Sequence, residues 1–247
     1  MRLAAWRAYL VYNKVYNETY LLLRKHYDTA VEFAGFTTPG DRFSNPERAL
    51  ASHVTTAFAR GLEDLGEPTS VISKFINNAP PTVISDAISS VGRSLHRDAV
   101  VPADISERLE CMFEAIIARC DTLTFAQREV ALGSFGWWFT AARQPWGIGS
   151  LLRTLSATGG TVEPMFRIVP KLAELSQSYP FEAAKALEML SRGESFFKFV
   201  YSNLAAIKTI LESSVRAGGA AKRDAVRINN RLMDWGSHDF AVLFRGY

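Results

Sequence analysis

The chain has 247 residues, of which 48% are hydrophobic and 21% charged, a composition typical of folded globular proteins. It is long enough to bury a sizeable core without disulfide staples, and its 16 Phe, 8 Tyr and 5 Trp argue against intrinsic disorder. The net charge of +3 is uneven, because residues 124–247 hold 15 Lys and Arg against 10 Asp and Glu. This half could face an acidic partner, although such an excess is also ordinary for a solvated surface.

Amphipathic segments closed by Gly, Pro or Asn follow one another along the chain, and no convincing strand separates them. Pairs such as Asn45-Pro46 and Tyr179-Pro180 combine features of a helix start, and glycines mark most of the ends. The expected helices cover, in chain order, 3–13, 16–34, 46–60, 68–77, a segment opened by Pro80-Pro81, a segment opened by Pro102, 125–142 capped by Thr124, 147–157, 164–178 with a kink or shifted start at Pro170, 180–193, 196–216 and 220–235. A short apolar tail spans 240–244.

The connections between these helices are short, which requires neighbouring helices to run antiparallel. Helix pairs recur at about 35 to 40 residues, the length of HEAT-type units. The sequence therefore predicts an all-α fold: an irregular α-solenoid of antiparallel helix pairs (HEAT-like), forming a single α-helical repeat domain over residues 1–247. A globular helical bundle is the alternative. The turn-rich loop at 36–46 is the one candidate for a domain boundary.

The two cysteines, Cys111 and Cys120, lie on one predicted helix. Nine residues at a rise of ~1.5 Å place their Cα atoms ~13 Å apart, too far for a disulfide. Reduced thiols favour a cytoplasmic location. No secretory signal is visible, and no stretch approaches the ~20 apolar residues of a membrane span, so we expect no contact with a membrane.

Catalytic and ligand-binding motifs are missing from the sequence, so we expect no cofactor, no metal and no enzymatic activity. The four histidines are scattered without the spacing of zinc ligands. Glu107, Glu110 and Glu114 share one helical face, where paired carboxylates could perform acid–base chemistry in a cleft. A solvated acidic face is the favoured interpretation, and an enzyme with a helical active site at these three residues is kept as a third possibility.

The densest aromatic cluster comprises Phe135, Trp137, Trp138 and Phe139, with Trp146 close by. Adjacent side chains on a helix point about 100° apart, so these rings cannot all face one way, and core packing is favoured. If one tryptophan is exposed to a partner, Trp138 or Trp146 is the candidate.

Arginines recur every four residues at Arg223, Arg227 and Arg231. This stripe could bind phosphate or an acidic protein surface, which would make the protein a nucleic-acid-binding helical module with a basic C-terminal face. A solvated face near the C-terminal end of a helix, where cations suit the helix dipole, is the favoured interpretation.

Several segments resemble the C-terminal HEAT-like helical region of large bacterial multidomain proteins, including STAND-type P-loop ATPases associated with phage defence. They are WRAYLVYNKVYNETYLLLRKHYDTAVE (6–32), residues 53–95, VALGSFGWWF (130–139), residues 162–193 and the closing segment 223–244. The resemblance implies a sensor or scaffold region that serves an N-terminal ATPase or effector and transfers no catalytic residues. Because the sequence shows no ATPase or effector, we expect either a fragment of a longer protein or a standalone subunit acting on a partner in trans.

The leading prediction is a non-enzymatic helical scaffold or sensor module that binds a protein partner, in the setting of bacterial antiviral defence. The concave surface of stacked helices would make the contact. Nucleic-acid binding through the basic C-terminal face is the alternative.

Overall fold

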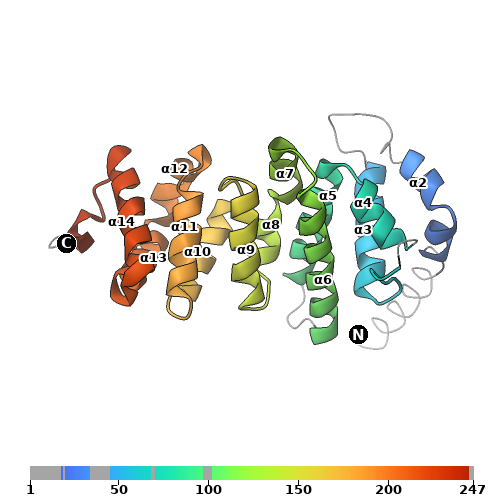
Figure 1. Cartoon of the computed structure of the whole chain (residues 1–247), viewed down its shortest axis with the longest axis horizontal. Helices are drawn as coiled ribbons and strands as arrows, with labels where there is room; N and C mark the ends of the chain where they lie inside the picture. Colours follow the sequence, from blue (N-terminus) through green and yellow to red (C-terminus); the bar gives the residue numbers. More distant parts are fainter. Residues whose placement is uncertain (1–17, 19, 34–44, 68–69, 97–101, 245–247) are drawn as a thin grey trace, which may run out of the picture. The chain divides into compact units, whose positions relative to one another are not determined.

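A computed structural model shows an all-α protein (Figure 1), which confirms the predicted fold class. The structure describes residues 18, 20–33, 45–67, 70–96 and 102–244, and every regular element among them is an α-helix or a short 3-10 helix. The predicted helix at 3–13 and the predicted loop at 36–46 lie outside these ranges. The α-solenoid over the whole chain and the single domain stay predictions.

The described helices belong to two compact units. Unit 1 draws on Met1–Ala87 and Pro102–Arg119, and unit 2 on Ile88–Val101 and Cys120–Tyr247. The long helix α5 contributes residues to both. Each unit is considered by itself below.

Unit 1 is built from four helices and the first half of a fifth, with residues 20–25 also helical. Its core takes fully buried side chains from three helices, among them Phe75, Ile84 and Phe113. The helices are α2 (Tyr27–Phe33), α3 (Asn45–Ala59), α4 (Val71–Asn78), α5 (Pro81–Leu95) and α6 (Ala103–Cys120).

The loop between α3 and α4 is held by an arginine of α6, Arg108. Helix α3 ends at Ala59, and Gly61 in the turn that follows has a φ of 74° that glycine adopts without strain. Arg108 lies over the Phe58 ring, 4.8 Å from its centroid, and its guanidinium donates hydrogen bonds to the carbonyls of Phe58 (2.9 Å) and Glu63. The buried carboxylate of Glu63 in turn accepts the N–H of Val71 at 2.9 Å, at the start of α4.

Unit 2 contains helix pairs that stack on one another. Helices α8 and α9, α10 and α11, and α13 and α14 contact within each pair; α10 also contacts α8 and α13, and α11 contacts α9 and α14 (Figure 1). The short connections make the partners in a pair antiparallel. The elements are α7 (Phe125–Leu132), α8 (Phe135–Phe139), α9 (Trp146–Ala157), α10 (Met165–Leu175), α11 (Pro180–Leu190), α12 (Glu194–Val200), η1 (Tyr201–Asn203), α13 (Leu204–Ala217), α14 (Gly219–Asp234) and η2 (Ala241–Phe244).

The helix predicted over 125–142 is instead two helices, α7 and α8. Its start is as expected, because Thr124 forms a capping box with Gln127. It breaks at Gly133, whose carbonyl accepts the N–H of Glu163 at 2.7 Å. The backbone carbonyl of Glu163 also occupies the space that a Cβ on Gly136 would need. The two glycines therefore allow the backbone at Glu163 to approach the helix closely, and this approach interrupts the helix.

The helix predicted over 196–216 is likewise interrupted, by the single 3-10 turn η1. In a continuous helix the carbonyl of Phe199 would accept the N–H of Asn203. Here it accepts two side-chain donors instead, Ser202 Oγ at 3.0 Å and Asn203 Nδ2 at 2.9 Å. Such side chains compete with the backbone ladder, and the competition separates α12 from α13.

We expect Gly136→Ala to destabilise the protein by about 2 kcal/mol or more, because the new methyl group meets the Glu163 carbonyl. Gly149→Ala, in the exposed interior of α9, is the matched control: nothing lies within 4 Å of its added Cβ, so we expect a gain of up to about 1 kcal/mol. Urea unfolding measures both free energies. Equal effects of the two substitutions would contradict the close packing at Gly136.

Candidate functional site

The arginine stripe does not form one continuous surface, because Arg231 is used inside the fold. Its Nη2 lies 2.9 Å from Glu188 Oε1, and its Nη1 donates to the Glu188 carbonyl at 2.9 Å and to Ser191 Oγ at 2.7 Å. These bonds join α14 to α11. Arg231 therefore has an internal role, and its contact with a phosphate or partner stays a prediction.

Glu188 is a buried carboxylate, with a side chain 1% exposed. Arg192, one turn further along the chain, reaches both of its oxygens, with Nη2 at 2.8 Å from Oε2 and Nε at 3.2 Å from Oε1. Burial raises the pKa of Glu188, but the hydrogen bonds and charges of Arg192 and Arg231 outweigh it and hold that pKa below its ordinary value. The carboxylate is thus charged in the folded protein.

The other two arginines of the stripe lie at the surface of α14. Arg227 pairs with Asp224 through an Nη1–Oδ1 contact of 3.1 Å while most of its side chain stays exposed, and Arg223 is exposed. Two outward arginines, one of them paired, make a weaker phosphate site than the sequence pattern suggests.

The tryptophan expected at the surface is in the core. Trp138 is 1% exposed and packs with its ring centroid 6.0 Å from that of Trp146 and 6.2 Å from that of Phe135. The choice of Trp138 as an exposed tryptophan is therefore wrong, and Trp146 is half-buried in the same cluster. The favoured prediction of core packing holds. Its neighbour Trp137 is half-buried instead, with the Arg167 guanidinium 4.8 Å from its ring centroid.

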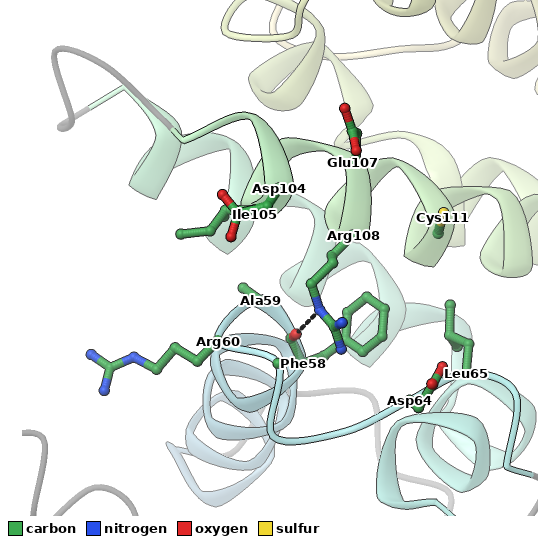
Figure 2. Close-up of a pocket in the computed structure, with 11 residues that line it drawn as sticks. Phe58, Ala59, Arg60, Asp64, Leu65, Asp104, Ile105, Glu107, Arg108 and Cys111 are labelled. Carbon is green, nitrogen blue, oxygen red and sulfur yellow. Dashed lines mark hydrogen bonds between the residues drawn. The ribbon is translucent and has the colours of Figure 1, made fainter.

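A cavity of about 710 Å³ in unit 1 lies between α6 and the end of α3 (Figure 2). Among the described residues that line it are Glu107 and Arg108, but not Glu110 or Glu114. Figure 2 shows Glu107 directed away from Phe58, while the Arg108 guanidinium is held by backbone carbonyls. The carboxylates of the proposed helical active site are therefore not gathered in this cavity.

Unit 2 carries a cluster of aromatic rings of which two are exposed. We call Phe197, Tyr201 and Trp235 the aromatic surface. The rings of Phe197 and Trp235 stack with centroids 3.6 Å apart and planes 6° apart. Tyr201 is 73% and Trp235 58% exposed. With Val200 and Leu232 they line a cavity of about 420 Å³, a size and character that suit an apolar side chain of a partner.

Local backbone features place both exposed rings. Trp235 closes α14, and Gly236 follows with a φ of 86°. The N–H of Gly236 bonds to the Met233 carbonyl and that of Ser237 to the Leu232 carbonyl, which is the hydrogen-bond pattern of a Schellman motif. Tyr201 begins η1, the turn created by the break after α12. The aromatic surface thus depends on one helix end and one helix interruption.

Sequence reasoning missed this surface, although one signal for it was present. Trp235 continues the four-residue spacing of Arg223, Arg227 and Arg231, and Gly236 marks the end of the helix. The contribution of Phe197 and Tyr201 had no comparable signal, because the interruption between α12 and α13 was not predicted.

Comparisons with known proteins do not assign the chain to a family. No protein-family model matches the chain, and comparison with curated proteins and with solved structures gives no significant match. Across the described ranges, no cluster of three or more metal-ligating side chains is found. None of the helices that the structure describes is long and apolar enough to cross a membrane.

We expect Glu188→Gln to lower the free energy of unfolding by about 2–4 kcal/mol at pH 7, because Arg192 and Arg231 lose the buried charge that they surround. The control is Glu174→Gln in the exposed Lys171–Glu174 pair, with an expected change within about 0.5 kcal/mol.

The same carboxylate predicts a pH dependence. Its pKa is lower in the folded state than in the unfolded chain, so its stabilisation is complete above the ordinary glutamate pKa of about 4.3 and is lost as the pH falls below it. The difference in stability between wild type and Glu188→Gln should therefore shrink between about pH 5 and pH 3 in urea unfolding. A constant difference over this range would contradict the lowered pKa.

Proposed function

We propose that this protein is a non-enzymatic helical scaffold or sensor module that binds a protein partner through the aromatic surface of unit 2. The observation that carries the proposal is the pair of exposed rings, Tyr201 and Trp235, beside an apolar cavity. Tryptophan and tyrosine are the residues most often found at the energetic centre of protein interfaces, where they fill pockets. Their exposure together on one surface is what such an interface requires before its partner arrives.

The aromatic surface is also preorganised. Phe197 is held by the stack with Trp235 on one side and packs edge-on to the buried Phe196 on the other, with centroids 5.6 Å apart. Leu232, one turn before Trp235, is buried and anchors that end of α14. Because these rings are already ordered, binding loses less conformational entropy than the ordering of a flexible loop would.

The resemblance to helical regions of STAND-type ATPases supports the finer part of the proposal. It favours an ATPase or effector as the partner, in cis or in trans, and a place in bacterial antiviral defence. The two free cysteines are in keeping with a cytoplasmic location. Binding of nucleic acid is the less favoured function, because Arg231 of the arginine stripe is used by Glu188 and Arg227 pairs with Asp224.

The test places a photo-reactive benzophenone amino acid at position 201 and, as a control, at the exposed Phe125 of α7. In cells of the native source, we expect cross-linking from position 201 to a protein of defined mass and little from position 125. Trp235→Ala should abolish the product while leaving the thermal unfolding temperature nearly unchanged, because the ring is largely exposed.

Two results would overturn the proposal. One is cross-linking from position 201 that does not exceed the level from position 125. The other is saturable ATP binding by the purified chain, which a scaffold without a nucleotide site would not show.

A further inference from the structure

A second surface of unit 2 combines aromatic rings with arginines, on helices other than those of the aromatic surface. We call it the basic ring cluster, and its members come from α5, α8 and the start of α10: Arg93, Trp137, Phe166 and Arg167. The guanidinium carbons of Arg93 and Arg167 lie over the Trp137 ring, 5.9 Å and 4.8 Å from its centroid. The Phe166 ring, 55% exposed, meets Trp137 edge-on with centroids 6.3 Å apart. Aromatic rings and cations thus alternate over a short distance.

Close packing between α5 and α8 holds this cluster in place. A Cβ on Gly92 would meet the backbone of Trp137, so the glycine lets the two helices touch immediately before Arg93. One turn after Gly92, His96 Nε2 lies 2.7 Å from Thr140 Oγ1, where α8 ends. The cluster is therefore built on packed helices rather than on a loop, and its rings and cations keep their spacing before a ligand arrives.

The two arginines keep their charge available to a ligand. Arg93 is exposed and donates a hydrogen bond to the Ser89 hydroxyl at 2.9 Å, and Arg167 is half-buried against the indole ring. Neither forms a salt bridge with a carboxylate of the described residues, although the exposed Glu163 lies only four residues before Arg167. Because the indole is uncharged, stacking on it orients the guanidiniums without neutralising them.

The charges that surround His96 also show the sign of this surface. Partial burial, and then the charges of Arg167 and Lys171, lower the pKa of His96, while a hydrogen bond with the Trp137 backbone acts in the opposite direction. The charged groups that act on the imidazole are therefore cations. Lys171 shares its charge with the exposed Glu174 at 2.8 Å, so the net charge beside the indole ring is that of the two arginines.

We propose that the basic ring cluster binds single-stranded nucleic acid, a function that goes beyond the proposed protein scaffold and does not rest on it. One base stacks on the exposed Phe166 ring, and neighbouring phosphates pair with Arg93 and Arg167. Rings for the bases and cations for the backbone are the two elements that single-strand-binding surfaces combine. The site is separate from the arginine stripe of α14, whose engagement in internal pairs does not affect it.

The combination of rings and cations favours this ligand over other anions. An acidic peptide would pair with the two guanidiniums, but its carboxylates would make no use of the exposed Phe166 ring. A double helix keeps its bases stacked inside, so it would offer the cluster only phosphates. A single strand presents a phosphate and an unstacked base at every nucleotide, which matches both kinds of group on this surface.

The test uses a fluorescein-labelled oligothymidylate of about ten nucleotides and an abasic strand of the same length and charge. Fluorescence anisotropy with the full chain should show the oligothymidylate binding at least about fivefold more tightly, because only this strand has a base to stack. The affinity of both strands should fall as the salt concentration rises.

Phe166→Ala and Phe181→Ala form a matched pair for the stacking contact. Each phenylalanine is the second residue of its helix, α10 and α11 respectively, and the two are 55% and 47% exposed. The preference for oligothymidylate should fall to about one in Phe166→Ala and persist in Phe181→Ala. Because the preference is a ratio between two strands on one protein, a change in the stability of the variant does not imitate it.

Arg93→Gln and Arg167→Gln test the phosphate contacts, with Arg223→Gln on the exposed face of α14 as their control. Each of the first two substitutions should weaken both strands and reduce the slope of log affinity against log salt concentration by about 0.7. Arg223→Gln should leave that slope unchanged.

Three outcomes would overturn the inference: equal affinity of the wild type for the two strands, a preference that persists in Phe166→Ala, or a salt slope that Arg223→Gln lowers as much as Arg93→Gln and Arg167→Gln do. Displacement of oligothymidylate by poly-glutamate at equal charge concentration would assign the surface to an acidic protein instead. Cross-linking from position 201 tests the protein-binding function separately, and Phe166→Ala should leave that cross-link unchanged.

Discussion

The buried carboxylate of Glu188 fixes the position of α14, on which the aromatic surface depends. Burial of a charged group costs free energy that only well-placed donors can offset. Arg192 supplies such donors from the turn that follows α11, and Arg231 adds a further donor from α14, so the carboxylate has its full set of donors only when α11 and α14 are docked. Trp235 follows Arg231 by one turn, and the Arg231–Glu188 contact therefore also sets where the exposed ring lies. The charge that makes Arg231 unavailable to a partner thus positions the residue proposed to bind one.

Helix positions could be predicted from the sequence wherever the signal was local. Thr124 with Gln127 at the start of α7, and the glycines that follow α3 and α14, act within a few residues of the boundary they mark. The two interruptions that the prediction missed have other causes. At Gly133 a backbone N–H from Glu163, thirty residues away, bonds to the helix carbonyl. At Phe199 the competing donors are local, but Ser and Asn side chains bond to backbone carbonyls in many helices without ending them.

Exposure was harder to predict than helicity, because residue spacing does not say what packs against a helix face. Arg227 and Arg231 occupy equivalent places in a four-residue pattern, yet the second reaches a buried glutamate and the first only the neighbouring Asp224. Trp138 and Trp235 also differ in what packs against them, since the first is 1% and the second 58% exposed. The first sits between helices that contact one another closely through Gly136, and the second ends a helix where the chain turns away at Gly236. The three residues of the aromatic surface were therefore not predicted, and the sequence indicated only the arginine stripe that precedes Trp235 on α14.

Stacked helix pairs ordinarily bury apolar side chains between neighbours and leave polar ones outside. Leaving Tyr201 and Trp235 exposed forgoes burial worth on the order of 2 kcal/mol for each side chain. The Schellman motif at Gly236 and the turn η1 hold both rings in ordered positions, so the exposure is not the result of a frayed helix end. A partner that covers the two rings recovers this free energy without reordering them. A surface that is apolar and ordered thus gives the greatest gain to a ligand that covers the two rings with apolar side chains.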